Sequence, residues 1–464
     1  MELKSLDEVR HATAALTSGN REALDRLVWT AVFGAPSLRD AARAAIFEQA
    51  HSAGIYPASI HGLYLARGRG EAPANFTVPA INIRCMAYDS ARALFRARKA
   101  LNAGTVICEI ARSEISYTDQ RPSEYTLVLL AAALREGWKG PLFVQGDHFQ
   151  VNAKKYTADP RTELEAVKSL TAEAVAAGFL NIDVDTSTLV DLSKSGHEAQ
   201  QALNGQLCAE LTAHIRTLEP KGVTVSVGGE IGEVGGKNST AEELDAFMKV
   251  YAEALAKQAP GAAGLSKISI QTGTSHGGVP LPDGTVAEVK LDFDTLEKLS
   301  KLARERYGLA GAVQHGASTL PAELFDRFPS LGACEIHLAT EFQNMIFEHP
   351  QFPADLKQQI YAYLREQAAD ERKPKDTDEQ FFYKTRKKAL GAYKRQLWSL
   401  PAATREAIGR TLEEKFAFLL LKLRVESTCD LAERHAPFVP GSYPAVKTTA
   451  VAAGGPEDVS GLSD

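Results

Sequence analysis

Four groups of potential metal ligands stand in this chain where short apolar runs end. They are Asp147-His148, Glu230, His276 and His315. Imidazole nitrogens and one carboxylate suit a catalytic zinc site, in which about three protein ligands leave a position open for substrate. The apolar runs read as strands, so the spacing predicts a metal site assembled from several strand ends. The competing interpretation is that each histidine is a hydrogen-bonded structural residue.

Glycines surround the last two of these histidines, in the stretches QTGTSHGGVPLPDG and QHGASTLP. Gly277, Gly278 and Gly316 allow backbone N–H groups to face an anion, and Ser318 adds a hydroxyl. Such nests at strand-to-helix turns bind phosphate. The pattern therefore predicts a phosphate site beside the metal, with tight turns alone as the alternative.

Asp147 directly precedes the first histidine. Neighbouring strand residues point to opposite sides, but both can reach the rim where a strand ends. A carboxylate beside a metal that polarises a carbonyl or hydroxyl is a natural proton acceptor. The alternative role for Asp147 is to orient a ligating histidine.

Alternating strands and helices must position these groups. Between residues 77 and 340, short β-branched runs alternate with amphipathic helical stretches, several of which end in glycine. Eight strands in this alternation predict an α/β fold, a (β/α)8 TIM barrel, whose strand ends meet at one rim. The predicted strands are 77–83, 105–110, 141–147, 179–185, 223–230, 266–273, 311–315 and 333–340.

The remaining segments divide the chain around this barrel. Residues 1–74 are predicted to be helical and to end in a loop at Pro57, Gly68, Gly70 and Pro73. The barrel is expected over 75–345, further helices over 346–439, and a disordered tail over 440–464.

A basic run, YKTRKKALGAYKR, covers residues 383–395 within the predicted C-terminal helices. Arg386, Lys387 or Arg395 in this run would suit a phosphate. The competing interpretation is a solvated helix face.

Composition narrows the class of protein. The formal net charge of −6 over 464 residues gives no reason to expect nucleic acid or an anionic membrane as partner. Five cysteines without a CxxC pair indicate neither a disulfide framework nor a thiolate zinc site. No signal peptide and no apolar run of about 18 residues is visible, so a cytoplasmic protein is expected.

These motifs give the chain a resemblance to a known family. VPAIN, GDHF, GGEIGEVGG, GTSHGG, QHGAS and EIHLATE resemble stretches of the class II, metal-dependent fructose-bisphosphate aldolases, over about residues 77–345. A weaker echo lies near Arg410 in GRTLEEKFAF. The resemblance implies that His148, Glu230, His276 and His315 are metal ligands and Asp147 the catalytic acid–base. It further implies that Asn82, Gly277, Gly316, Ser318 and Thr340 lie at the substrate or its phosphate.

The resemblance also implies an activity. The chain would be a zinc-dependent lyase of glycolysis and carbohydrate metabolism, using Zn²⁺ or another divalent metal and possibly a monovalent cation. It would cleave a ketose phosphate, by default fructose 1,6-bisphosphate, to glycerone phosphate and glyceraldehyde 3-phosphate. A homodimer or homotetramer is expected, with Arg410 serving across the interface. The alternatives are a sugar (phosphate) epimerase using the same retro-aldol step and a non-catalytic sugar-phosphate binding protein.

Two departures from the family pattern fall around the expected substrate. Where the family has acidic loop residues, this chain has Lys237-Asn238. Glu233 is the expected replacement catalytic acid, with Glu242 and Glu243 as alternatives. His337 and Ala339 stand where the family has an asparagine and an aspartate, so His337 is expected to contact substrate.

A third departure is Glu109, which stands at the end of a predicted strand where the family has an uncharged polar residue. Glu109 is a candidate replacement acid–base. The competing interpretation is a structural ion pair with Arg112 or Arg84. Altered residues around intact metal ligands predict retained chemistry on a changed substrate.

Overall fold

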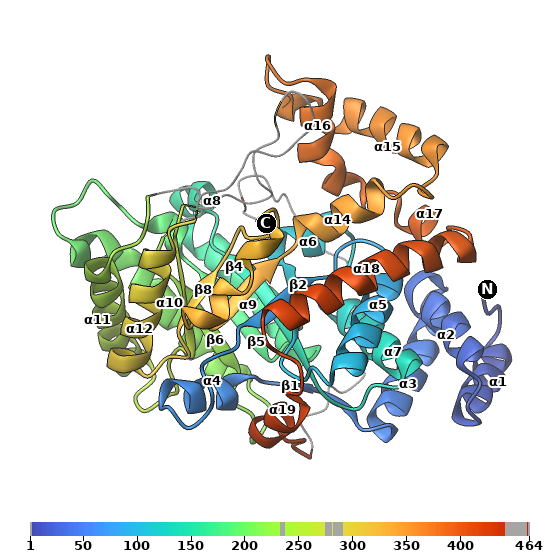
Figure 1. The fold of residues 1–464 in the computed structure, drawn as a ribbon, viewed down its shortest axis with the longest axis horizontal. Helices are drawn as coiled ribbons and strands as arrows, with labels where there is room; N and C mark the ends of the chain where they lie inside the picture. The colour runs from blue at the N-terminus through green and yellow to red at the C-terminus, as the bar shows by residue number, and fades with distance from the viewer. Residues whose placement is uncertain (1, 233–236, 274–280, 282–290, 441–461, 463–464) are drawn as a thin grey trace.

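The chain folds around a closed barrel of eight parallel strands (Figure 1). The computed structural model describes residues 2–232, 237–273, 281, 291–440 and 462. Sheet order runs β1-β4-β3-β2-β9-β8-β7-β6-β5, and a β4–β5 pairing closes the barrel. The (β/α)8 prediction is therefore confirmed, and each predicted run overlaps one barrel strand. These strands are β2 (Val78–Asn82), β3 (Ile107–Ala111), β4 (Gly140–Gln150), β5 (Asn181–Asp185), β6 (Ser226–Glu230), β7 (Lys267–Ile270), β8 (Ala312–Gln314) and β9 (Glu335–Leu338).

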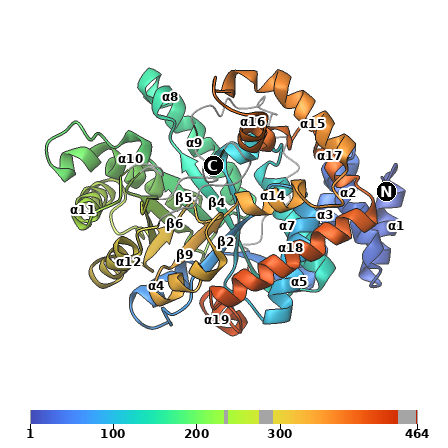
Figure 2. The same cartoon turned by 45° about the horizontal axis from the view of Figure 1, so that its top comes forward.

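Helices between the strands cover the outside of the barrel (Figure 2). Local sequence explains where they begin and end. Thr240 and Glu243 form a capping box at the start of α11, and Gly137 and Gly308 end α7 and α12 in the left-handed conformation. These helices are α5 (Ala87–Leu101), α6 (Arg112–Tyr117), α7 (Pro122–Glu136), α8 (Ala153–Ala158), α9 (Pro160–Ala176), α10 (His197–Leu218), α11 (Ala241–Gln258), α12 (Phe293–Tyr307) and α13 (Arg327–Ser330).

The first 74 residues contain more than the predicted helices and loop. Three helices, α1 (Leu6–Thr17), α2 (Arg21–Phe33) and α3 (Pro36–Ser52), match the expectation. The prediction of a loop at Pro57 and Gly68 is wrong, because β1 (Ile55–Ala58) and α4 (His61–Gly68) occupy this stretch. β1 pairs with the first residues of β4, from Gly140 to Phe143, ahead of the part of β4 that meets β5. Pro57 is tolerated there because β1 is an edge strand.

Helix α4 packs at the floor of the barrel, against the amino ends of β8 and β9. Arg67 is buried and donates to the carbonyl oxygens of Ala310 at 3.0 Å and of Gly332 and Ala333 at 3.0 Å each. These three residues precede β8 and β9. Tyr64, also buried, donates its hydroxyl hydrogen to Glu335 at the start of β9. The N-terminal segment is thus joined to the barrel interior.

The C-terminal helices pack on the barrel and on the N-terminal segment. They are α14 (Thr340–Phe347), α15 (Ala354–Gln367), α16 (Asp378–Thr385), α17 (Lys394–Trp398), α18 (Ala402–Lys422) and α19 (Cys429–His435). In both ribbon views α18 lies alongside α5, as their contacts require (Figures 1 and 2). One continuous apolar core runs from Leu3 to Ala436. Among the helices described, none combines the length and apolar character that a membrane span requires.

The basic run at 383–395 is not one helix, and only part of it is a solvated face, to which the exposed Arg395 belongs. It is divided among α16, a 3-10 turn at Arg386–Ala389, and α17. Arg386 is buried and pairs with Glu348 at 2.5 Å, which contradicts the expectation of a solvated face for this residue. Arg395 stacks over the rings of Trp29 and Phe33. Arg386 therefore connects the 3-10 turn to the end of α14, and Arg395 connects α17 to α2.

Candidate metal centre and substrate rim

Three predicted metal ligands meet inside the rim at the carboxyl ends of the strands. His148, Glu230 and His315 each offer a ligand atom, and these atoms lie within 4.8 Å of one another. All three side chains are buried, and the imidazole centroids of the two histidines are 4.5 Å apart. They come from β4, the last residue of β6 and the residue after β8. The fourth predicted ligand, His276, lies outside the described residues.

A β-bulge brings both Asp147 and His148 to the inside of the barrel. β4 was predicted to end at Asp147, but it continues to Gln150. Its register against β5 shifts between Gly146 and Phe149, and His148 takes the left-handed φ of 39°. An extra residue in one strand re-aims its neighbours, so adjacent side chains can share one face. Such a conformation costs about 1–3 kcal/mol for a non-glycine residue and is typical of functional sites.

Gly146 permits this bulge. A Cβ at this position would stand 2.4 Å from the Phe149 ring, whose side chain is buried. The close approach of the ring and the backbone therefore requires glycine.

Asp185, at the end of β5, orients His148, the first of the predicted ligands. Its Oδ2 lies 3.2 Å from His148 Nδ1 and accepts a hydrogen bond of 2.5 Å from Gln150 Nε2. Its Oδ1 accepts from the backbone N–H and hydroxyl of Ser187, at 3.0 and 2.7 Å. A carboxylate held this firmly fixes the imidazole ring of a metal-ligating histidine.

We expect Asp185→Ala to weaken metal binding by about 10- to 100-fold without unfolding the protein, because the ligands remain but one loses its orientation. Competition with a chromogenic chelator measures the metal affinity. The matched control is Asp191→Ala, which removes an aspartate that caps a surface turn at Ser193 in the same way. Equal metal affinity in the two variants would show that Asp185 does not orient His148.

The second histidine is oriented from β7. Ser269 Oγ lies 3.0 Å from His315 Nδ1, and Glu230 Oε1 lies 3.4 Å from the same nitrogen. Burial and the neighbouring charges of His337 and His148 hold the pKa of His315 well below its ordinary value. A neutral imidazole carries the lone pair that a metal ion needs, so His315 is in the protonation state of a ligand.

The donor set fits a divalent ion. Burial alone would lower the pKa of His148, but the carboxylates of Asp147 and Glu230 outweigh it and raise that pKa well above its ordinary value. In the protein alone a proton thus supplies the positive charge that these carboxylates require. A divalent cation held by two imidazoles and one carboxylate would supply that charge instead, with ligands typical of zinc.

His337 lies at the centre of a second buried cluster on the same rim. Its Nδ1 is 2.9 Å from Glu109 Oε2 and 3.2 Å from Asp147 Oδ1. Its Nε2 is 2.7 Å from Glu335 Oε1 and 3.6 Å from Asp183 Oδ2. Carboxylates face both ring nitrogens, and Glu109 and Asp147 raise the pKa of His337 well above its ordinary value against the effect of burial. The ring is therefore an imidazolium that stacks edge-on against His315, with centroids 4.1 Å apart.

The pKa values of the two predicted acid–base residues, Asp147 and Glu109, are shifted in opposite directions. Burial works against a charged Asp147, but His148 and His337 outweigh it and hold the pKa of Asp147 well below its ordinary value. Burial raises the pKa of Glu109 to about 8. Asp147 is thus ready to accept a proton, whereas Glu109 holds a proton more tightly than an ordinary glutamate does.

The structure excludes one interpretation of Glu109. It contacts His337 and Gln145, the latter at 3.3 Å. The alternative of an ion pair with Arg84 or Arg112 is wrong, because those arginines pair with Glu114 and Glu163, respectively.

Lys267 neutralises two buried carboxylates inside the barrel, those of Asp183 and Glu335. This buried residue of β7 donates to Gln145 at 2.8 Å, to Asp183 at 2.9 Å and to Glu335 at 2.5 Å. Burial would lower the pKa of Lys267, but Asp183 and Glu335 raise it above its ordinary value, so the ammonium stays charged. Burial raises the pKa of Asp183 to about 6. The barrel interior is therefore polar and cross-linked between β4, β5, β7 and β9.

The expected anion-binding residues lie at the ends of β8 and β9. Gly316 has a φ of 67°, which favours glycine, and Ser318 Oγ accepts a 2.7 Å hydrogen bond from the Ala339 N–H. Thr340 follows as the first residue of α14. The other two expected glycines, Gly277 and Gly278, lie outside the described residues.

The remaining predicted site residues are not all brought to this rim. Glu233 lies outside the described residues. Glu243 caps α11 and pairs with Lys237 at 2.6 Å, which commits its carboxylate to the helix start. Asn238 donates to Asp292 at 2.9 Å. Arg410 is exposed on α18, and no described contact joins it to the buried cluster.

Sequence reasoning missed the supporting polar residues of the barrel interior. They carry a usable signal, because charged residues two apart inside an apolar strand point to the same side. Asp183 and Asp185 in NIDVD show this spacing, as do Glu335 and His337 in EIHL. The missed residues are Tyr64, Glu114, Gln145, Asp183, Asp185, Lys267, Ser269 and Glu335.

Comparison with known proteins agrees with this geometry. One solved structure is that of a probable tagatose 6 phosphate kinase from Sinorhizobium meliloti, which shares 16% sequence identity with this chain. The match has a TM-score of 0.54 and covers 77% of this chain and 98% of the kinase chain, which supports the fold. A fructose-bisphosphate aldolase from Campylobacter jejuni also shares 16% identity, covering 81% and 97%, at a TM-score of 0.47. The model of the class-II fructose-bisphosphate aldolase family matches residues 71–409. This match spans most of the chain and both clusters described above, so the chain belongs to the class-II fructose-bisphosphate aldolase family.

Proposed function

We propose that this protein is a divalent-metal-dependent lyase that cleaves a ketose phosphate between C3 and C4, with fructose 1,6-bisphosphate as the default substrate. The observation that carries the proposal is the meeting of His148, Glu230 and His315 within 4.8 Å, beside an ionised Asp147. Zn²⁺ is the ion that suits this donor set best. When bound, the ion supplies Lewis-acid polarisation of the substrate ketone.

Asp147 is the proposed base for bond cleavage. Its carboxylate accepts the proton of the C4 hydroxyl, a carbonyl forms at C4, and the electron pair of the C3–C4 bond passes to C3. The proposed base is well placed for this role, since its Oδ1 lies 3.2 Å from the His337 imidazolium, which stabilises the ionised carboxylate before the reaction. The acid that protonates C3 is proposed to be Glu233.

The anionic end of the substrate is assigned to the ends of β8 and β9. Backbone N–H groups at Gly316 and the side chains of Ser318 and Thr340 provide donors suited to a phosphate. Glu109 is buried next to Asp147, and its Oε1 has no hydrogen-bond partner among the described residues, so it is available to a hydroxyl near the reacting carbons. Such a group suits a polyhydroxylated substrate.

Cleavage tests the proposal directly. Metal-loaded protein is expected to release triose phosphate from fructose 1,6-bisphosphate in a coupled assay, and to lose this activity with a chelator and regain it with Zn²⁺. If an isomeric ketose forms without net cleavage, the epimerase alternative is correct. If neither product forms from any ketose phosphate tried, the protein is not such an enzyme.

Asp147→Ala is expected to lower kcat by about 10²- to 10⁴-fold, the usual contribution of a positioned acid–base group, while metal content is unchanged. Steady-state kinetics and metal analysis of the same preparation measure both. The control is Asp245→Ala, which removes an aspartate paired with Arg306 outside the site. Undiminished turnover by the Asp147 variant would remove this residue from the mechanism.

A further inference from the structure

Glu114, on the short helix α6 after β3, is a buried carboxylate that no motif identified. It accepts three hydrogen bonds: from Asn82 Nδ2 at 2.6 Å, from Arg84 Nη1 at 2.7 Å and from the Ala111 N–H at 2.8 Å. Its side chain is 1% exposed, and that of Arg84 is 3% exposed. An ionised carboxylate only accepts hydrogen bonds, so Asn82 must present its NH2 group to Glu114. This pairing fixes the orientation of the Asn82 amide.

Asn82 faces the inside of the barrel. Ala80 on β2 is in register with His337 on β9, and Asn82 is in register with Glu109 on β3. Registered residues of neighbouring strands point to the same side, and both partners lie in the buried cluster around Asp147. The side chain of Asn82 therefore lies at the rim of that cluster.

The carbonyl oxygen of Asn82 has no partner among the described residues. Oδ1 is buried and accepts no hydrogen bond, while Nδ2 is used by Glu114. A buried acceptor left without a donor costs about 1–3 kcal/mol. A substrate hydroxyl is the donor that this oxygen would meet at the rim.

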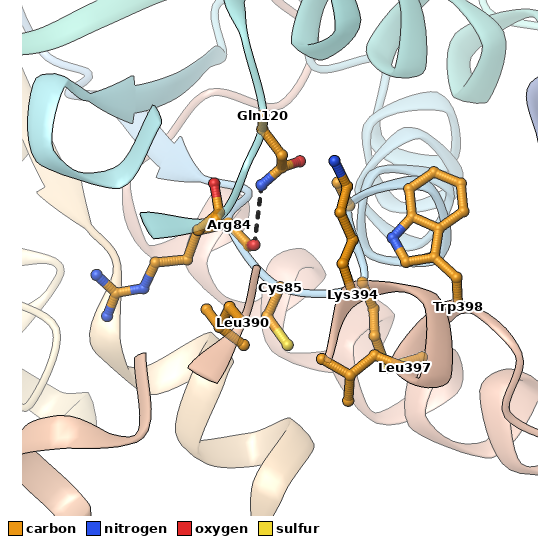
Figure 3. A pocket seen from close by; sticks show the side chains of 10 residues that line it. Arg84, Cys85, Gln120, Leu390, Lys394, Leu397 and Trp398 are labelled. Atoms are coloured by element: carbon orange, nitrogen blue, oxygen red, sulfur yellow. Dashed lines mark hydrogen bonds between the residues drawn. The ribbon is translucent and has the colours of Figure 1, made fainter. Parts of the chain in front are cut away.

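Arg84 reaches the anion end of the same site. Its Nη2 lies 3.4 Å from Thr340 Oγ1, while Nη1 remains on Glu114 and on Tyr117 Oη at 3.2 Å. Figure 3 shows the guanidinium directed away from Lys394 and Trp398, while Gln120 Nε2 donates to the Arg84 backbone oxygen at 3.0 Å. A guanidinium beside Thr340 suits a phosphate bound there.

We infer that Glu114 is a positioning residue that aims the Asn82 carbonyl at a substrate hydroxyl and the Arg84 guanidinium at a substrate phosphate. The inference rests on the proposed function and deepens it. Glu114 touches no substrate itself, but it arranges one contact to a substrate hydroxyl and one to a substrate anion. The ligand class it implies is a hydroxylated phosphate ester.

A double-mutant cycle tests whether Glu114 acts through Asn82. Asn82→Ala and Glu114→Ala are each expected to lower kcat/KM by on the order of 100-fold, the effect of losing substrate alignment. The double variant is expected to be no worse than Glu114→Ala alone, because the same contact is lost only once. Losses that multiply in the double variant would overturn the inference.

Further variants separate positioning from stability. Glu114→Gln keeps one acceptor oxygen and is expected to recover at least tenfold over Glu114→Ala; if the alanine variant fails to fold, the cycle is run with glutamine. Arg84→Gln is expected to raise KM and to weaken inhibition by inorganic phosphate while largely sparing kcat. The control Glu124→Gln breaks another buried pair, with Lys394 at 2.5 Å, and is expected to leave kcat/KM within about twofold.

The inference and the proposed function fail in different ways. If the metal-loaded wild type cleaves no ketose phosphate, the proposed function is wrong. The same cycle is then measured on the Kd for glycerone phosphate by titration calorimetry. Non-additive losses of affinity would support the role of Glu114, and multiplicative losses, or a Glu114 variant that binds like the wild type, would overturn it.

Discussion

His148→Ala is expected to lose the bound metal ion and to lower kcat/KM by about 10³-fold or more. The physical reason is the loss of one of three proposed metal ligands, and with it several kcal/mol of transition-state stabilisation that a Lewis acid supplies. Metal analysis by mass spectrometry and steady-state kinetics, on one preparation, measure the two effects. Added Zn²⁺ at high concentration is expected to restore only part of the activity.

A matched histidine separates ligand loss from a general effect of the substitution. His214 is half-buried on α10, where its Nε2 lies 3.3 Å from the Lys168 carbonyl oxygen, outside the rim. His214→Ala is expected to keep its metal and its kcat/KM. A full metal complement together with unchanged turnover in the His148 variant would contradict the assignment of the centre.

Lys267→Met is expected to destabilise the protein by about 3–5 kcal/mol, because it removes the ammonium between the buried carboxylates of Asp183 and Glu335 and leaves only His337 to balance both. Equilibrium urea denaturation of the metal-loaded protein measures the free energy of unfolding. The control, Lys249→Met, breaks an exposed pair with Glu198 and is expected to leave the free energy of unfolding nearly unchanged.

The same substitution has a predictable pH dependence. Without the ammonium, the pKa values of Asp183 and Glu335 rise relative to those in the folded wild type, because burial is less well opposed. The folded variant then binds more protons than the folded wild type, so its loss of stability grows as the pH rises through these pKa values. The deficit relative to wild type is expected to be smaller at pH 5 than at pH 8. A deficit that grows on acidification would show that these carboxylates are not charged in the native barrel.

Much of the fold was predictable because each barrel strand leaves a short apolar run in the sequence. The exceptions have physical causes. β1 was missed because Pro57 normally interrupts a strand, and only its edge position makes it acceptable. The end of β4 was placed too early because Asp147 and His148 break the apolar pattern, whereas a bulge carries the strand three residues further.

Within the site, only the residues at the strand ends were predictable from the sequence. His148, Glu230 and His315 were found because histidines and acids at strand ends are conspicuous, and the structure brings these three together. Lys267 and Glu335 were missed because a charged residue within a strand resembles a surface residue until its partner across the barrel is known. That partner is set by strand order and register, which the linear pattern does not contain. Glu114, on α6, was missed for a related reason, since its partners Asn82 and Arg84 lie at and just after the end of β2.

The contact between Tyr64 and Glu335 limits how this protein can be divided. The first 74 residues resemble an appendage in sequence, yet the Tyr64 hydroxyl hydrogen-bonds to the carboxylate that also holds His337 and Lys267. A barrel excised at residue 75 would lose this hydrogen bond to a buried carboxylate beneath the proposed catalytic site. A chimera that exchanges this barrel for that of a homologue would therefore have to include the N-terminal segment as well. The smallest exchangeable unit is larger than the barrel.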